Sequence, residues 1–336
     1  MAIAGGAGAP HVVTEPCSGP GTTTAAGPPM GLFTGASCAS SYGTAMGSTE
    51  VQRRHVLRRF AEFADHYPGL PLYRAICTGC LRDPDVASLL LQARPGQLRP
   101  VLLFAALHHV VLQNPHTRAA RWYASVAGRD RYIAAMLGAA AADLPDLPVT
   151  LLELGASAGL LLAADRYDLT MRRDDGDLRL GDPASAVSCV GEDRTAAGDR
   201  RPWRLPAVTE RIGVDVNPVH VDDDDGMRWL QACLWPDVPG RVELFAAAAA
   251  QLRACPAQQR PVLVAGNMVD DLPAVLHRHA GAHLVVLSSW AVTYVDRDRR
   301  ALIAEHLGEQ ARATGQPVSW VSAEPVGCVP GVPASQ

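Results

Sequence analysis

The chain has 336 residues, of which 48% are hydrophobic and 19% are charged, and its formal net charge at pH 7 is −4. This length allows one large domain or two smaller ones with a buried core. A small negative charge without a dense basic stripe argues against nucleic-acid binding. No apolar run reaches the ~20 residues that span a bilayer, and the first residues lack the pattern of a signal peptide. We therefore expect a cytoplasmic protein that binds neither nucleic acid nor membrane, and whose oligomeric state is open.

The eight cysteines are dispersed along the chain and, without a secretion signal, are predicted to be reduced thiols. Cys77 and Cys80 have the C-x-x-C spacing that can hold zinc, but no second pair completes a four-ligand set. The four acids from Asp222 to Asp225 precede a helical segment, where they complement the helix dipole. No metal site is expected.

The composition divides the chain into segments. Residues 1–48 are rich in Gly, Ala, Thr, Ser and Pro and carry one charged side chain, Glu15, so they are predicted to form a disordered tail. Residues 49–147 are predicted to be a helical cap, because apolar residues recur at helical spacing. The helices expected there are Val51–Tyr67, Leu72–Leu81, Pro84–Leu91, Leu98–Gln113 and Arg118–Ala142. Residues 326–336 are expected to be a short tail.

From residue 148 to 325, strand-like and helical segments alternate, which predicts a doubly wound α/β domain with a mostly parallel sheet. An inserted hairpin is expected at about 166–206, where short alternating runs occur. The expected strands are Val149–Leu154, Glu210–Val216, Val262–Ala265, Leu284–Ser288 and Val318–Ser322. The expected helices are Gly159–Asp165, Met227–Leu234, Asp271–His279 and Asp296–Thr314.

The most informative stretch is residues 150–162. An apolar run ends on the acid Glu153, and three small residues, Gly155, Ser157 and Gly159, follow at alternate positions before an apolar run resumes. This pattern predicts a buried strand, a tight turn and a helix whose N-terminus can hold a ligand.

Residues 155–159 also spell G-x-S-x-G, the nucleophile elbow of serine hydrolases. An elbow normally follows several strands, whereas the strand here is the first of the predicted sheet, and an elbow has no use for Glu153. The candidate bases are also poorly placed for a loop after a late strand: His277, His279, His283 and His306. The ligand loop is favoured. A serine hydrolase using Ser157 and a non-catalytic binding or scaffold protein stay open as alternatives.

The spacing of the small residues resembles the E-x-G-x-x-x-G loop of class I S-adenosylmethionine-dependent methyltransferases more than the G-x-G-x-x-G of dinucleotide folds. The resemblance implies that Glu153 orients the amino-acid end of S-adenosylmethionine and that Asp215, at the end of the second strand, takes its ribose. The residues that it implies for cofactor binding are Glu153, Gly155, Ala156, Ser157, Gly159, Asp215, Asn217, Asn267 and Met268. For the small-molecule substrate it implies Ser288, Ser289 and Trp290. Tyr294 joins them because, like Trp290, it follows the fourth strand at the carboxyl edge, where open parallel sheets bind ligands.

Over residues 51–325 the chain resembles the actinobacterial domain-of-unknown-function family 2332, which is itself similar to methyltransferases in fold. The resemblance is carried, in chain order, by residues 152–160, 165–167, 213–218, 228–230, 234–237, 266, 271–273, 289–294 and 319–324. The family has no settled activity, so this resemblance implies a fold and not a reaction. From the loop pattern we expect a methyltransferase that acts on a small molecule, with no catalytic residue assigned. Three positions depart from the family's pattern, since Leu161, Asn267 and Ser288 stand where polar or ionisable groups are usual.

Overall fold

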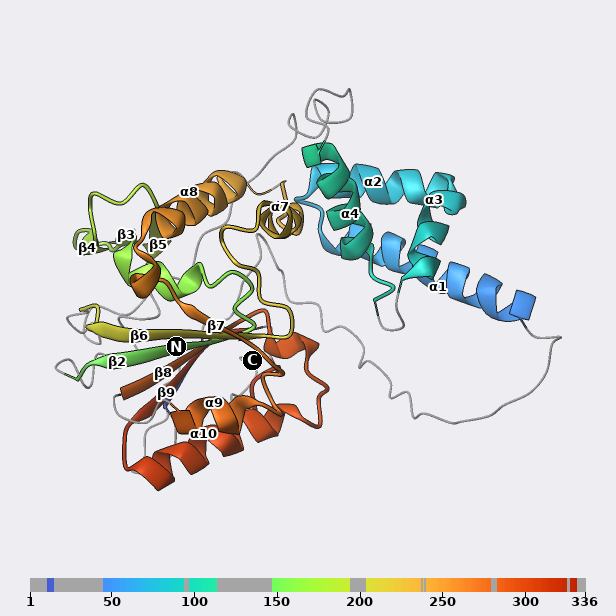
Figure 1. Cartoon of the computed structure of the whole chain (residues 1–336). Coiled ribbons are helices and arrows are strands. Elements are labelled where there is room, and N and C mark those ends of the chain that lie inside the picture. The colour runs from blue at the N-terminus through green and yellow to red at the C-terminus, as the bar shows by residue number, and fades with distance from the viewer. Residues whose placement is uncertain are drawn as a thin grey trace. The chain divides into compact units, whose positions relative to one another are not determined.

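The computed structural model describes residues 11–14, 45–93, 97–113, 147–193, 204–236, 238, 240–278, 283–324 and 327–330. The chain divides into two compact units (Figure 1). The sheet unit comprises Met1–Cys17, Arg131–Met227 and Glu243–Gln336, and the helical unit comprises Ser18–Asp130 and Arg228–Val242. None of the described helices is long and apolar enough to cross a membrane.

The helical unit packs its helices around an aromatic core. Its helices are α1 (Ala45–His66), α2 (Pro71–Arg82), α3 (Pro84–Ser88), η1 (Leu89–Gln92) and α4 (Pro100–Gln113). Tyr73 stacks on Phe104 with ring centroids 4.4 Å apart, and the ring of Trp235 lies 6.0 Å from that of Tyr73. The unit therefore includes 228–242, which lie beyond the cap expected over 49–147. The helix expected over Arg118–Ala142 lies outside the described residues.

The sheet unit is built on a six-stranded sheet in the order β1-β9-β8-β2-β6-β7, in which every neighbouring pair is parallel. Its strands are β1 (His11–Thr14), β2 (Val149–Leu154), β6 (Val208–Asp215), β7 (Val262–Ala265), β8 (His283–Ser289) and β9 (Val318–Ala323). The prediction of an α/β fold with a mostly parallel sheet is confirmed. The chain runs from β2 outward to β7 and then returns to β8 on the other side of β2. The strand order thus reverses between β2 and β8, the kind of place where open α/β sheets bind ligands.

The strand bounds follow the apolar pattern closely, and the helices less so. The bounds predicted for β2 and β7 are confirmed. Those of β6 and β8 shift by one or two residues at both ends, and that of β9 by one residue at its C-terminal end. The helices of this unit are α7 (Asp224–Ala232, which continues into the helical unit), α8 (Arg241–Ala254), α9 (Leu272–Arg278) and α10 (Arg300–Thr314). Between β6 and β7 the pattern predicted α7 alone and missed α8, whose alanine run lacks a polar face to mark the helical period.

The N-terminal segment expected to be disordered contains a strand. β1 occupies His11–Thr14 and pairs in parallel with β9, with His11 opposite Ser319. Helix α1 likewise begins at Ala45, inside that segment. Composition alone could not reveal β1, because pairing with an edge strand depends on a partner more than 300 residues away in the chain.

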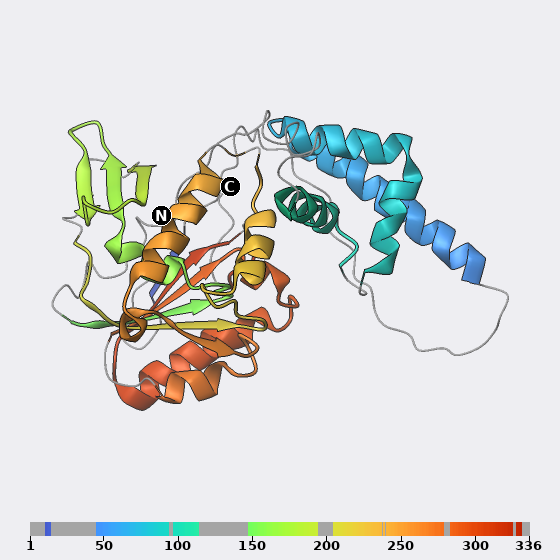
Figure 2. The same ribbon diagram turned by 45° about the horizontal axis from the view of Figure 1, so that its top comes forward.

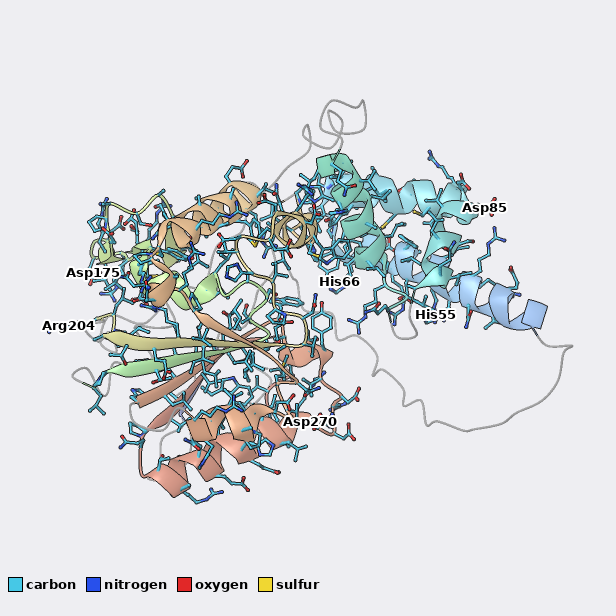
Figure 3. The ribbon with its side chains drawn as sticks, viewed as in Figure 1. His55, His66, Asp85, Asp175, Arg204 and Asp270 are labelled. Carbon is cyan, nitrogen blue, oxygen red and sulfur yellow. The ribbon has the colours of Figure 1, made fainter. Side chains whose placement is uncertain are left out.

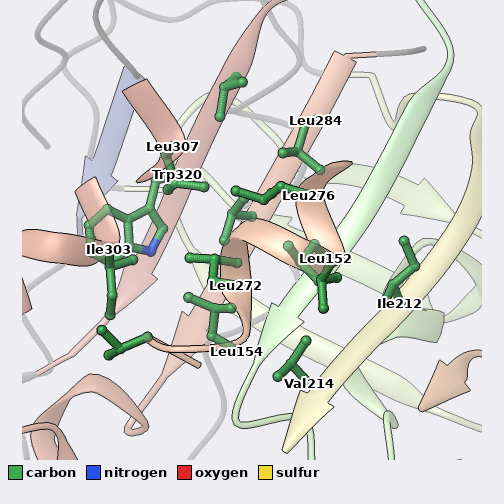
Figure 4. Packing of buried hydrophobic residues seen from close by; sticks show 14 of the residues in the cluster. Leu152, Leu154, Ile212, Val214, Leu272, Leu276, Leu284, Ile303, Leu307 and Trp320 are labelled. Carbon is green, nitrogen blue, oxygen red and sulfur yellow. The ribbon is translucent and has the colours of Figure 1, made fainter. Parts of the chain in front are cut away.

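Alternate residues of the strands face two separate hydrophobic clusters, one on each side of the sheet. Leu152, Leu154 and Trp320 pack against α9 and α10 (Figure 4). Val149 and Leu151 belong to the cluster on the other face, which includes Ala248 of α8. Figure 1 shows α8 on one side of the sheet and α9 with α10 on the other. Glu153 follows the same alternation and shares the α8 side.

A second, three-stranded sheet is inserted after β2 (Figure 2). It consists of β3 (Asp168–Arg172), β4 (Leu178–Gly181) and β5 (Ser188–Glu192), with β4 antiparallel and β5 parallel to β3. The hairpin expected at about 166–206 is therefore present as β3 and β4, with β5 added. Buried Arg211 of β6 ties the insertion to the main sheet through two hydrogen bonds of 2.8 Å to Asp165.

Candidate functional site

The loop after β2 turns sharply. Gly155 and Gly159 have positive φ angles of 76° and 69°, and Ser157 has a φ of 51°, which is uncommon for a residue with a side chain. The loop leads into η2 (Leu161–Arg166), a 3₁₀ helix of six residues. The helix expected over Gly159–Asp165 is therefore present as a short 3₁₀ helix that begins and ends slightly later, because the chain turns into the inserted sheet before a longer helix can form.

The backbone amides of this loop are largely used inside the protein. The N–H groups of Gly155 and Ala156 donate to the carbonyl of Val214, at 2.8 and 3.2 Å. The N–H of Ser157 donates to Oδ2 of Asp215 at 2.9 Å, and that of Gly159 to the carbonyl of Ala156 at 2.7 Å. The loop therefore does not present the free helix N-terminus that was expected to bind a ligand.

Gly155 is required by packing against the turn that follows β8. A Cβ added at Gly155 would lie 2.5 Å from the Cβ of Ala291 and 3.6 Å from Cε of Met268. Real side chains do not tolerate such a contact, and the positive φ adds strain for any other residue. Gly155 therefore serves close contact between protein segments, and these contacts bring the loop after β2 together with those after β7 and β8.

Glu153 is the most unusual side chain of the site. It is 3% exposed, and its Oε2 has no hydrogen-bond partner among the described residues. Burial raises the pKa of this carboxyl well above its ordinary value, and the nearby charge of Asp215 raises it further. A buried carboxyl without partners is costly in its charged form. Glu153 therefore favours a proton, or a positively charged partner, that the described residues do not supply.

Asp215 ends β6 beside this loop, as expected for the second acid. Its Oδ2 accepts the N–H of Ser157, and its Oδ1 accepts the N–H of Asn217, each at 2.9 Å. Asp215 is half-buried, whereas Asn217 is exposed. Because each carboxylate oxygen has a second lone pair, Asp215 can hold the loop and still accept a further hydroxyl.

The turn after β7 is joined to the same edge of the sheet. The N–H of Gly266 donates to the backbone carbonyl of Asp215 at 2.9 Å. The Oδ1 of Asn267 accepts the N–H groups of Val269 and Asp270, at 2.8 and 3.2 Å. The side chain of Asn267 thus closes its own turn, while Met268 lies towards Gly155.

The residues predicted to face the substrate differ in exposure. Ser288 is buried, and its hydroxyl accepts a hydrogen bond of 3.1 Å from Nε1 of Trp320, which differs from the ligand contact expected of it. Ser289 is half-buried at the end of β8. Trp290 and Tyr294 are 50% and 69% exposed. The two aromatic side chains are therefore the accessible members of this group.

Glu324 and Arg300 hold the turn that carries these aromatic residues, and neither was predicted as a site residue. Oε1 of Glu324 accepts the N–H groups of Ala291 and Val292, at 2.9 and 3.0 Å. Arg300 donates to the carbonyl of Val295 at 3.0 Å. Glu324 lies in the stretch 319–324 that carries the family resemblance, but that stretch did not indicate its role, and no motif marks Arg300, because each acts on backbone groups brought to it by the fold.

The serine-hydrolase alternative gains an unengaged hydroxyl on Ser157 but lacks, among the described residues, a base that is hydrogen-bonded to it. The hydroxyl of Ser157 forms no hydrogen bond with a described residue, as an unengaged nucleophile would. The N–H of Val219 donates to the carbonyl of Ser157 at 2.9 Å, which brings the next residue, His220, near the loop. Sequence reasoning did not consider His220. Its Nδ1 lies 3.5 Å from Asp222, and its side chain is mostly exposed.

The remaining motifs have structural explanations. Cys77 and Cys80 are buried on α2, and burial raises the pKa of Cys77 to about 12, so its thiol stays protonated. Of the acidic run, Asp222 pairs with Arg260 at 2.6 Å and Asp224 with Arg253 at 2.8 Å. Among the described residues, no group of three or more His, Cys, Asp or Glu side chains is arranged to hold a metal ion.

A family model described as an uncharacterized protein conserved in bacteria (DUF2332) matches residues 54–135 and 126–329. The match spans most of the chain, including the loops after β2, β6, β7 and β8. The chain therefore belongs to the DUF2332 family. No curated protein and no solved structure matches it.

Proposed function

We propose that this DUF2332 protein is an S-adenosylmethionine-dependent methyltransferase that acts on a small molecule. The observation that carries the proposal is the convergence of four loops at the carboxyl edge of one parallel sheet. The loop after β2 is bonded to Asp215 after β6, Asp215 is bonded to Gly266 after β7, and Gly155 packs against Ala291 after β8. The strand order reverses at this edge, which is where α/β sheets take their ligands.

The residues at this edge fit the chemical groups of S-adenosylmethionine. The orphaned carboxyl of Glu153 suits the ammonium of the amino-acid end, and Asp215 has lone pairs left for the ribose hydroxyls. Met268 offers an apolar contact to an adenine ring. When bound, the cofactor would supply an electrophilic methyl group.

The protein's own residues then contribute position and exclusion of water. A methyl displacement needs an acceptor atom aligned in front of the reacting carbon, and alignment alone can lower the barrier by ~7 kcal/mol or more. Exposed Trp290 and Tyr294 follow β8, across the reversal point from Asp215, where an acceptor would lie. No general base is assigned, because an acceptor that is already nucleophilic does not need one.

Titration calorimetry of the full-length protein with S-adenosylmethionine and S-adenosylhomocysteine tests the proposal. We expect micromolar binding that weakens at least about ten-fold, or ~1.4 kcal/mol, in Asp215→Asn and in Glu153→Gln. Asp177→Asn is the matched control, since Asp177 is exposed on the turn between β3 and β4. No binding at millimolar ligand would overturn the proposal and favour a non-catalytic scaffold protein.

The second candidate is a serine hydrolase, favoured by the positive φ and unengaged hydroxyl of Ser157 and by the hydrogen bond that Val219, the residue before His220, donates to the carbonyl of Ser157. A fluorophosphonate probe that labels the wild type but not Ser157→Ala would support it. A wild-type protein that stays unlabelled, while a known serine hydrolase in the same tube reacts, would reject it.

A further inference from the structure

The turn between β8 and α10 is held by charged side chains at both ends. It contains η5 (Val292–Tyr294), a single 3₁₀ turn. On the amide side, the carboxylate of Glu324 accepts three consecutive N–H groups, those of Ala291, Val292 and Thr293, at 2.9, 3.0 and 3.4 Å. A negative charge is thus placed where the dipole of the turn is positive.

On the carbonyl side, the guanidinium of Arg300 donates to the carbonyl of Thr293 at 3.3 Å and to that of Val295 at 3.0 Å. A positive charge therefore lies where the backbone dipole is negative. Arg300 and Glu324 come from α10 and from the residue after β9, so two elements outside the turn determine its shape. The turn is clamped rather than free to move as a lid.

Glu324 and Arg300, together called the clamp, maintain a strained backbone at Trp290. Its φ of 52° is a rare value for a bulky residue and costs about 1–3 kcal/mol. Such a conformation persists only when the surrounding contacts impose it. The indole of Trp290 is 50% exposed, although a buried tryptophan would contribute more to stability. Tyr294, at the other end of the same turn, is 69% exposed.

We propose that Glu324 and Arg300 are positioning residues that hold the Trp290–Tyr294 turn as a preformed platform for a planar ring of the methyl acceptor. This inference rests on the proposed function, and it adds the chemical class of the substrate. An indole and a phenol present flat π faces, which stack on other aromatic rings with a preference that aliphatic groups do not share. Preforming the platform removes the ordering cost that a flexible loop would pay on binding.

The platform can be tested on the full-length protein with 4-fluorophenol as the probe and trifluoroethanol as the non-aromatic comparison, observed by fluorine NMR line broadening. We expect broadening with 4-fluorophenol only. Its dissociation constant should rise about ten-fold in Trp290→Ala. In Glu324→Gln and Arg300→Met, which keep the shape of the side chains, we expect about a three- to five-fold rise.

The matched controls are Glu305→Gln and Arg299→Met. Glu305 is exposed on α10, and Arg299 is the neighbour of Arg300 but pairs with Asp270, which Figure 3 labels. We expect both controls to bind 4-fluorophenol as the wild type does. Arg300→Lys, which keeps the charge, should recover part of the affinity lost in Arg300→Met.

Fluorescence distinguishes positioning from general loss of structure. For the wild type and for each variant, the emission of Trp290 is obtained by subtracting the emission of the same protein with the additional substitution Trp290→Phe. Acrylamide should quench this emission about two-fold more in Glu324→Gln and Arg300→Met than in wild type, while far-ultraviolet circular dichroism and S-adenosylmethionine affinity stay unchanged. Clamp variants with wild-type 4-fluorophenol affinity would overturn the proposal, as would a loss of affinity that accompanies unfolding. Binding of 4-fluorophenol that depends on the clamp, without binding of S-adenosylmethionine, would reject the methyltransferase and retain the platform.

Discussion

Two glutamates at the carboxyl edge of the same sheet are buried to almost the same extent, yet their surroundings are opposite. Glu153 at the end of β2 is 3% exposed and Glu324 after β9 is 5% exposed. Glu324 accepts three backbone N–H groups, whereas Oε2 of Glu153 has no partner among the described residues. Burial raises the pKa of both carboxyls, but backbone N–H groups oppose the rise at Glu324, and the charge of Asp215 adds to it at Glu153.

The difference separates a structural acid from a candidate ligand-binding acid. A buried carboxylate that the protein itself satisfies contributes to a defined loop. One that is left without partners costs stability, and proteins retain such costs chiefly at functional sites. Glu324 is therefore a structural residue at this edge of the sheet, and Glu153 is a candidate contact of the ligand that we propose to bind there.

The largest effect is expected from removing the satisfied acid. Glu324→Leu leaves three N–H groups without an acceptor, and at about 1 kcal/mol or more for each, the free energy of unfolding should fall by ~3 kcal/mol. Urea denaturation followed by circular dichroism measures this loss. The exposed control Glu305→Leu should stay within about 0.5 kcal/mol of wild type. An equally small change for Glu324→Leu would show that the hydrogen bonds of Glu324 do not stabilise the folded protein.

Removing Glu153 should instead increase the free energy of unfolding. Glu153→Met replaces a buried carboxyl, whose Oε2 has no partner among the described residues, with an apolar side chain of similar length. At neutral pH we expect a gain of about 1–2 kcal/mol in the free energy of unfolding. The same substitution should abolish binding of S-adenosylmethionine in calorimetry. A destabilised variant would mean that Glu153 has a structural partner after all.

The pH dependence of the free energy of unfolding should show that ionisation of Glu153 destabilises the folded protein. Because the folded pKa of Glu153 is raised, the folded protein holds its proton more tightly than the unfolded chain does. This contribution is most favourable at low pH and is lost as pH rises from the ordinary value of 4.5 through the raised folded pKa, with a slope of at most ~1.4 kcal/mol per unit. The stability difference between Glu153→Met and wild type should therefore grow with pH over this window. Denaturation at several pH values measures it, and a constant difference would contradict the raised pKa.

The smallest effect is a proton released on binding. If an ammonium group takes the place of the proton on Glu153, binding of S-adenosylmethionine releases up to about one proton at a pH below the raised pKa. The apparent enthalpy should then vary with the ionisation enthalpy of the buffer. Glu153→Gln should abolish that variation in whatever binding is left, and a wild type without it would show that Glu153 stays protonated or is not the ammonium partner.

The strands could be predicted from the sequence because each depends mainly on its own residues. The apolar runs over Val149–Leu154 and Val262–Ala265 gave their bounds directly. The two acids of the proposed site, Glu153 and Asp215, were found because each stands where such a run ends. In contrast, β1 and α8 were missed, one because its partner is remote in the chain and the other because its alanine-rich run shows no clear polar face.

Local sequence thus determined the α/β alternation, the sharp turn after β2 and the acids at the strand ends, because apolar periodicity, glycines and strand termini are properties of neighbouring residues. Only the tertiary structure decided that the amides of that turn are used internally, that Oε2 of Glu153 meets no partner in the described part of the chain and that Glu324 and Arg300 clamp the turn at Trp290. These are relations between segments that are separated in the chain, such as Ser157 with Asp215, 58 positions apart, and Ala291 with Glu324, 33 positions apart. Hydrogen-bond satisfaction is set by which backbone groups the fold brings within about 3 Å of a side chain, and that information is absent from any single stretch of sequence.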